Sequence, residues 1–179
     1  MDVFEAIRGR RSIRAYISSE IDPNKLKVIL EAAIWAPSAG NLQPWEFVVV
    51  DDKDVMRHLA RASLHQMWMS EASAIVAVCA DVDRTGAIYG ERGRRLYAIQ
   101  DCAAATQNLL LASYSLGLGT CWVGAFYEEE VRRILKLPTN VRPLALVPIG
   151  QPGESPSPPA RRSLREVVHH NVFGKPWSI

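Results

Sequence analysis

The sequence predicts a single α/β or α+β domain in which helices cover a sheet, and three observations support this prediction. The 179 residues are enough for one hydrophobic core but too few for two comfortable ones. Hydrophobic residues make up 48% and charged residues 22% of the chain, as in globular rather than disordered proteins. Helical patterns alternate with short β-branched runs before the proline-rich segment near the C-terminus. We therefore expect residues 1–179 to fold as one domain.

Start signals and periodicity define the elements of the first half of the chain. Asp22 is a typical helix N-cap, Pro23 suits the first helical position, and apolar residues then recur at helical spacing. Short β-branched runs are typical of buried strands. The predicted elements are a helix over 22–35, a strand over 47–50, an amphipathic helical segment over 54–61 and a strand over 74–78.

A long helix is predicted over 94–116, ending at Gly117. Its apolar residues cover most of its circumference, so it must be buried on nearly all sides, either centrally or against another subunit. We expect both. The remaining predicted elements are a strand over 120–123, a helix over 128–136 with acidic residues in its first turn, and a strand over 144–149.

A proline-rich segment, Gln151–Pro159, follows the last predicted strand and cannot form a helix or an inner strand. Ser163 and Glu166 then have capping-box spacing, which predicts a terminal helix. A helix beyond such a linker needs a surface to dock on, and a partner subunit would supply one. We therefore interpret residues 151–179 as a linker and a C-terminal extension that docks on a partner subunit.

The composition argues against several classes of partner. The formal net charge is only +2, so no net field favours nucleic acid or anionic lipid. Residues 1–5 lack a basic start followed by an apolar run, and the longest apolar-rich stretch, 72–80, is too short to span a membrane. Cys79, Cys102 and Cys121 stand among apolar neighbours and are interpreted as core residues. We expect a cytoplasmic protein with neither a nucleic-acid nor a membrane partner.

Two arginine runs stand near opposite ends of the chain. They are Arg8, Arg10, Arg11 and Arg14, with Ser12 among them, and Arg161, Arg162 and Arg165. Guanidinium groups this close repel one another unless an anion or carboxylates compensate them, and arginine presents a fork suited to bidentate phosphate binding. The runs favour a phosphate ligand on which both would converge. The alternative is a solvated basic face with surface ion pairs.

The segment 37–45 joins a helix to a strand through small, polar and ring-containing residues. Its prolines fix φ and Gly40 frees the backbone, so the loop can be rigid and polar at once. A structural turn accounts for the prolines and the glycine. It does not account for the carboxamides of Asn41 and Gln43 or for Trp45. A binding role, for which Ser38, Asn41 and Gln43 offer hydroxyl and amide groups, is therefore the alternative to a purely structural turn.

A glycine also follows the short strand predicted over 120–123. At Gly124 a planar ligand can approach the backbone closely and contact its amide groups. The alternative interpretation is a structural glycine at a strand end, after a helix C-cap at Gly117.

In order and spacing, these segments resemble the nitroreductase family of flavin mononucleotide (FMN) enzymes over essentially the entire chain. The segments that carry the resemblance are Arg10–Arg14, Ala36–Trp45, the strand within 72–81, Gln100–Leu109 of the long helix, Gly119–Gly124 and Arg161–Arg162. The resemblance implies an α+β sandwich with a central, mostly antiparallel sheet flanked by helices. It also implies an intertwined homodimer with two flavins at the subunit interface.

The resemblance also implies which residues bind FMN. Arg10, Ser12 and Arg14 would bind the ribityl phosphate and the pyrimidine edge, with Arg11 alongside, and Arg161 and Arg162 would complete the phosphate clamp. Ser38, Asn41 and Gln43, with the backbone of Pro37 and Ala39, would reach the flavin from the other subunit. The backbone amides of Val123, Gly124 and Ala125 would approach N5 and O4 of the ring, and Gln66 would be a further contact.

The implied activity is reduction of nitroaromatics, quinones or related electron-poor small molecules by NAD(P)H, in ping-pong hydride transfers through flavin N5. Such an enzyme needs no nucleophile or metal, and the sequence has no zinc-type Cys/His spacing and no G-x-S-x-G motif. Arg14 is the candidate for stabilising the reduced, anionic flavin. The alternatives are a flavin-storage protein, or a dehalogenase or flavin-fragmenting enzyme on the same scaffold.

One segment departs from the larger relatives, which carry extra helices beside the substrate channel. Here the stretch between the second strand and the long helix, 82–93, is short. It either leaves the pocket open or forms a mobile lid.

Overall fold

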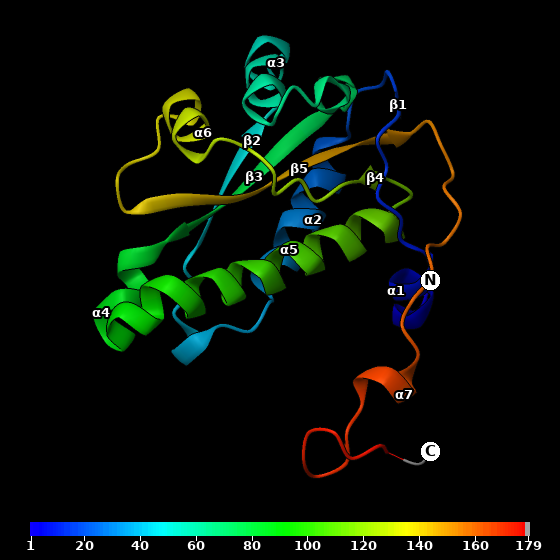
Figure 1. Cartoon of the computed structure of the whole chain (residues 1–179). Helices are drawn as coiled ribbons and strands as arrows, with labels where there is room; N and C mark the ends of the chain where they lie inside the picture. Colours follow the sequence, from blue (N-terminus) through cyan, green and yellow to red (C-terminus); the bar gives the residue numbers. More distant parts are fainter. Residues whose placement is uncertain (178–179) are drawn as a thin grey trace.

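A five-stranded antiparallel sheet between layers of helices forms the body of the computed structural model, which describes residues 1–177 (Figure 1). The strand order is β1-β5-β3-β2, and β4 pairs with β5. The strands are β1 (Tyr16–Ile17), β2 (Trp45–Val50), β3 (Ala74–Asp81), β4 (Gly119–Thr120) and β5 (Val141–Pro152). The predicted α+β fold, an antiparallel sheet flanked by helices, is confirmed.

Helices α2 and α7 begin at the caps that the sequence predicts. The Asp22 side chain accepts a hydrogen bond of 2.8 Å from the backbone N–H of Asn24, and Pro23 opens the helix. The capping box of Ser163 and Glu166 is also present. The helices are α1 (Val3–Gly9), α2 (Pro23–Ile34), α3 (Lys53–Ala62), α4 (Val82–Arg92), α5 (Ala98–Ser115), α6 (Glu128–Leu135) and α7 (Leu164–Val167), with short 3₁₀ turns at Ala39–Asn41 and Met67–Glu71.

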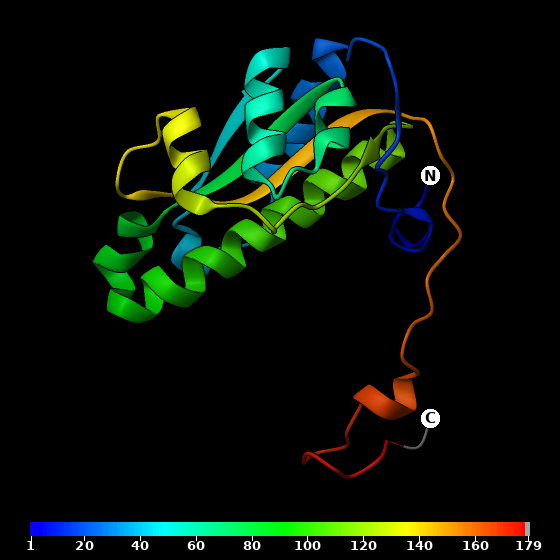
Figure 2. The same cartoon turned by 45° about the horizontal axis from the view of Figure 1, so that its top comes forward.

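Alternate residues of β3 face two separate cores. Val76 and Val78 pack with residues of α2 and α5 in the first core. Ile75 and Ala77 pack with residues of α3 and α6 in the second core. Figures 1 and 2 accordingly show α3 and α6 on one side of the sheet and α5 on the other. Because both faces of β3 are covered, its side chains are apolar without alternation, as the sequence predicts for a buried strand.

Helix α5 buries one side in the first core, where Leu109 is fully buried, and leaves a stripe of residues outside it. Ile99, Ala103, Gln107 and Leu111 recur every four residues on a face that belongs to neither core. These four residues are called the free stripe of α5. Within one chain Ile99, Ala103 and Leu111 are half-buried and Gln107 is exposed, so a second surface would complete the burial of the stripe.

The segment 82–93 forms helix α4, which folds back on a π-helical turn at Gly93–Tyr97. Glycines permit this close packing, since a Cβ on Gly93 would lie 2.5 Å from the carbonyl oxygen of Thr85. Gly90 has a φ of 57°, in the left-handed region that favours glycine. The helix predicted over 94–116 is correspondingly divided, and α5 begins only at Ala98.

The strand predicted over 120–123 is interrupted. Strand β4 ends at Thr120, which pairs with Ile149, and Val123 forms an isolated bridge with Leu146. This register places Cys121 opposite Pro148. Because proline has no N–H to donate, the pairing lapses between Thr120 and Val123.

Strand β5 is longer than the predicted 144–149 and runs to Pro152. The first two residues of the segment 151–159 extend this strand, but there they pair with β1 alone and so stand at an edge of the sheet. A proline is tolerated there because it stands at the very end of the strand. Beyond it, α7 is a single turn without buried residues, and both views show it clear of the body (Figures 1 and 2).

Candidate functional site

The two arginine runs meet in one cleft of about 300 Å³. Its lining residues are Arg10, Arg11, Ser12 and Arg14 from the N-terminal segment and Pro156, Ser157, Pro159 and Arg161 from the extension. Arg162 is not among them, because its guanidinium donates to the carbonyl oxygen of Glu166 at 3.1 Å. The structure thus brings Arg161, but not Arg162, to the N-terminal arginines.

Backbone hydrogen bonds hold the arginine segment in place. Ser12 forms a parallel bridge with Thr120, and the N–H of Ile13 donates to the carbonyl oxygen of Thr120 at 2.9 Å. The N–H of Gly153 donates to the carbonyl oxygen of Ala15 at 2.8 Å. Residues 10–15 therefore lie between β4 and the start of the extension.

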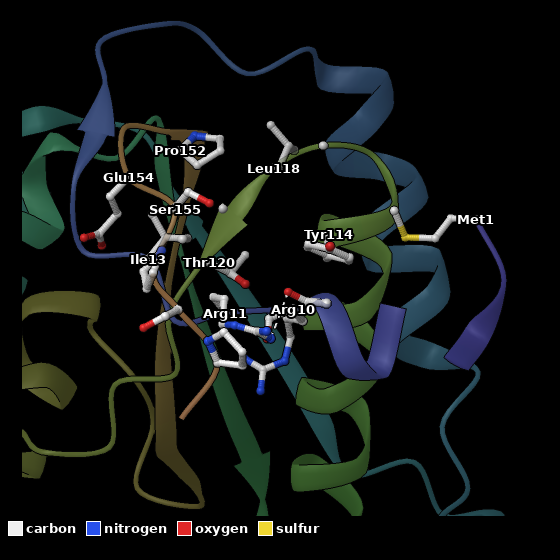
Figure 3. Close-up of a pocket in the computed structure, with 16 residues that line it drawn as sticks. Met1, Arg10, Arg11, Ile13, Tyr114, Leu118, Thr120, Pro152, Glu154 and Ser155 are labelled. Atoms are coloured by element: carbon white, nitrogen blue, oxygen red, sulfur yellow. Dashed lines mark hydrogen bonds between the residues drawn. The ribbon is translucent and has the colours of Figure 1, made fainter. Parts of the chain in front are cut away.

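A larger cleft of about 670 Å³ adjoins this segment. Figure 3 shows Arg10 and Arg11 close together at one end, with Tyr114 and Leu118 beside the cavity. The hydroxyl oxygen of Thr120 is buried here without a hydrogen-bond partner. Both clefts thus share the two arginines that stand at the end of α1.

The arginines of the smaller cleft lack carboxylate partners. Within residues 1–177, no ion pair involves Arg10, Arg11, Arg14 or Arg161. The Nε atoms of Arg10 and Arg11 are buried without a hydrogen-bond partner. Arg11 also closes helix α1, because its Nη1 donates to carbonyl oxygens at the end of that helix. Surface ion pairs therefore do not explain the cluster, and uncompensated guanidinium groups favour an anionic ligand.

Val123, Gly124 and Ala125 lie beside Gln66. The Nε2 of Gln66 donates to the carbonyl oxygen of Ala125 at 3.3 Å, and Val123 exchanges two backbone hydrogen bonds of 2.9 Å with β5. Gly124 is exposed, and a Cβ added there would come no closer than 3.8 Å to Trp122. The backbone at Gly124 is thus open to a planar ligand.

The polar loop that follows α2 is locked by its own hydrogen bonds. The Ser38 hydroxyl oxygen accepts from the N–H of Gln43 at 3.0 Å, and the Gln43 Nε2 donates to the backbone and side-chain oxygens of Asn41 at 3.2 Å each. Gly40, Asn41 and Gln43 have φ values of 56°, 56° and 52°. Asparagine adopts the left-handed region readily, whereas Gln43 is strained there, and such strain is found at functional sites.

A buried carboxylate that the sequence analysis did not single out holds this loop. Asp101, in the first turn of α5, is only 7% exposed, and its Oδ1 accepts from the N–H of Ala39 at 3.1 Å. Its Oδ2 is buried without a hydrogen-bond partner. Burial raises the pKa of Asp101, and the Ala39 N–H lowers it by less. The sequence feature that could have identified Asp101 is an acidic residue within a helix predicted to be buried on nearly all sides.

Replacing Asp101 with asparagine is expected to stabilise the fold at neutral pH. Because the pKa is raised in the folded state, the carboxyl stabilises the fold fully below its unfolded pKa of about 4, and this contribution is lost as the pH rises through the folded pKa. Asparagine keeps an oxygen for the Ala39 N–H and carries no charge. Thermal unfolding should show a higher melting temperature for the variant than for the wild type at about pH 8, but no such difference at about pH 3. An increase in melting temperature that is the same at both pH values would contradict the burial of a charged carboxylate.

Within one chain, the polar loop and the arginine cleft lie at opposite ends of α5. Ala39 contacts Asp101 in the first turn, and Gly9 lies against Tyr114 in the last. At 1.5 Å rise per residue, the distance from residue 101 to residue 114 is about 20 Å. The structure therefore does not bring Ser38, Asn41 and Gln43 to Arg10 within one chain.

The three cysteines are buried thiols, as predicted. Burial raises the pKa of Cys79 to about 12 and also raises those of Cys102 and Cys121. Across the part of the chain that the structure describes, no group of three His, Cys, Asp or Glu residues is placed to hold a metal ion. In the same part, no helix is both long and apolar enough to cross a membrane.

An antiparallel sheet between two helical layers, with a basic cleft at one edge, defines an α+β protein of the class that the sequence analysis expected. The family model described as "Nitroreductase family" matches residues 7–151. The chain belongs to the nitroreductase family.

Similar proteins extend over most of the chain. A Methanothermobacter thermautotrophicus protein, provisionally named NADH dehydrogenase/NAD(P)H nitroreductase, is 36% identical over 87% of this chain and 80% of that protein. An NADH dehydrogenase of Thermus thermophilus is 33% identical over 94% of this chain and 95% of its own length. The structure of the NADPH:FMN oxidoreductase of Vibrio harveyi, complexed with NAD+, is 28% identical, with a TM-score of 0.88, and the match covers 96% of this chain and 78% of that one.

Proposed function

We propose that this chain is an FMN-dependent oxidoreductase that takes electrons from NAD(P)H and passes them to nitroaromatics, quinones or related electron-poor acceptors. The observation that carries the proposal is the cleft in which Arg10, Arg14 and Arg161 stand without carboxylate partners. A flavin phosphate is an anion suited to such a cleft. Membership of the nitroreductase family and the names of similar proteins support the same activity.

The residues present fit the phosphate end of FMN. The buried Nε of Arg10 has no hydrogen-bond partner and would donate to the phosphate, together with Ser12, Arg14 and Arg161. Arg11 would add charge from alongside. Arg162, which lies outside the cleft, stays a prediction from the family resemblance.

The residues also fit the ring end. The open backbone at Gly124 and Ala125, with Gln66 beside it, would take the planar ring. Cys121 lies beside Ser12 and Arg14, and Gly124 is three residues further on, which is about 10 Å of extended chain. Bound FMN supplies a two-electron carrier between the nicotinamide and the acceptor. The chain holds and orients the ligands, and Arg14 is the candidate for stabilising negative charge on the cofactor.

We further propose a homodimer in which two chains share each site. Antiparallel pairing of two α5 helices through their free stripes would bring the loop of one chain to the cleft of the other. The loop residues concerned are Pro37, Ser38, Ala39, Asn41 and Gln43. The extension exposes Val172, Phe173 and Trp177, apolar side chains that a partner subunit would cover. Three free, buried cysteines accord with a reducing cytoplasm.

The spectrum of the purified protein tests this function most directly. We expect bound flavin, or its uptake when FMN is added, and bleaching by NADH or NADPH without oxygen. Subsequent addition of a quinone or a nitroaromatic compound should restore the oxidised spectrum. A protein that stays colourless with FMN would overturn the proposal. Bound flavin that neither nicotinamide reduces would indicate the storage alternative, and a reduced flavin that these acceptors do not reoxidise would indicate a specialised member of the family.

A further inference from the structure

The extension that carries Arg161 has few attachments to the body. The N–H of Gly153 donates to the carbonyl oxygen of Ala15. Three of the next six residues, 154–159, are prolines, which have no backbone N–H to donate to a neighbouring strand. In the described part of the extension, every hydrogen bond beyond Glu154 is made within the extension itself. The position of Arg161 relative to the N-terminal arginines therefore depends on the contacts made at residues 152–154.

Glu154 makes the last of these contacts. Its Oε1 accepts hydrogen bonds from two consecutive backbone N–H groups, those of Arg14 and Ala15, the second at 3.2 Å. Glu154 forms no ion pair with any arginine in residues 1–177. Figure 3 shows its carboxylate directed away from the guanidinium groups of Arg10 and Arg11. The carboxylate thus binds the backbone of the arginine segment and leaves its charges uncompensated.

We propose that Glu154 is a positioning residue of the phosphate cleft, which it builds by joining the extension to the backbone of Arg14. This inference rests on the proposed function, since the cleft is taken as the FMN phosphate site. With the two segments joined, Arg10, Ser12 and Arg14 face Arg161 across one cleft. Without the join, Arg161 is connected to the body only through a proline-rich linker.

A positioning role for Glu154 and a purely electrostatic role predict opposite changes in FMN affinity when the carboxylate is removed. Removing a carboxylate near a phosphate site should strengthen phosphate binding if only the electrostatic potential matters. If Glu154 positions the cleft, then Glu154→Ala should weaken FMN binding, by about tenfold for the loss of two hydrogen bonds to an ionised acceptor. Glu154→Gln keeps an oxygen acceptor and loses the charge, so it should bind FMN at least nearly as well as the wild type.

The experiment titrates the flavin-free full chain with FMN and with riboflavin, which lacks the phosphate, and follows flavin fluorescence. We expect Glu154→Ala to lose about tenfold in FMN affinity and little in riboflavin affinity, and Glu154→Gln to restore FMN binding. Hydrogen exchange at the amides of Arg14 and Ala15 should quicken in the alanine variant alone. Glu130→Gln, which removes an exposed acid of α6, is the charge control and should match the wild type.

The inference can be overturned by the FMN and riboflavin affinities of Glu154→Ala. Tighter FMN binding by Glu154→Ala would show that the residue acts through its charge, and equal losses for FMN and riboflavin would show a general structural role. The Arg10→Ala variant distinguishes a failure of this inference from a failure of the proposed function. If that variant weakens FMN binding as expected while Glu154→Ala does not, only the positioning role fails; if Arg10→Ala changes nothing, the phosphate site itself is wrong.

Discussion

A Leu111→Arg variant is expected to be monomeric and to lose at least about a hundredfold in FMN affinity. Leu111 lies on the free stripe of α5, outside both cores. A twofold interface places the same stripe of both chains together, so one substitution introduces two like charges, which costs several kcal/mol. The polar loop of the partner would then no longer reach the arginine cleft. Sedimentation equilibrium and FMN titration of the same sample measure both effects.

Glu130→Arg is the matched control for this variant. It places an arginine at an exposed position of α6, away from α5, and should remain dimeric with wild-type FMN affinity. Circular dichroism would establish that the Leu111→Arg chain is folded. A folded monomer that binds FMN as tightly as the wild type would refute the shared site, and an unchanged dimer would refute the free stripe as its interface.

Helices α2 and α7 were predictable from the sequence because their start signals are local, whereas α4 was not predicted. The N-cap at Asp22 and the capping box at Ser163 depend on residues two and three positions away, and both lie where the sequence places them. The apolar character of β3 was equally readable, since a strand buried on both faces needs no alternation. These features involve neighbours along the chain, which a single sequence displays.

Features that depend on strand register or on close packing could not be predicted from the sequence. The interruption opposite Pro148 follows from pairing with a segment 27 residues away, and the alignment of the two strands is known only from the structure. The fold-back of α4 depends on Gly93 meeting the backbone of Thr85, a contact that a helical pattern does not reveal. The same holds for Asp101, whose partner Ala39 is 62 residues distant.

The candidate site was predictable in chemistry but not in geometry. Like-charge repulsion within each arginine run indicated an anionic ligand, and Arg161 does meet Arg10 in one cleft. That Arg162 instead bonds to Glu166 depends on the turn at the start of α7. The polar loop was identified by its carboxamides, but its distance from the cleft shows that its proposed role requires a second chain.

Replacing Arg10 and Arg161 together with alanine is expected to lower FMN affinity by about 10²- to 10⁴-fold. Each charge-assisted hydrogen bond to a phosphate contributes about 1.5–3 kcal/mol, so either single variant should lose about tenfold or more. Both side chains line the same cleft, from opposite ends of the chain. Riboflavin affinity should stay nearly constant, because riboflavin has no phosphate for these residues to bind. Flavin fluorescence titration of the stripped protein measures both affinities.

The Arg8→Ala, Arg165→Ala double variant distinguishes contact from net charge. It removes one arginine from each of the same two segments, yet neither side chain lines the cleft. If specific contacts hold the phosphate, this control should bind FMN nearly as well as the wild type, since exposed charges that do not contact the phosphate act only through a potential that physiological salt screens. Equal losses in the two double variants, both abolished by added salt, would mean that the overall positive potential attracts the cofactor and that the cleft does not hold it.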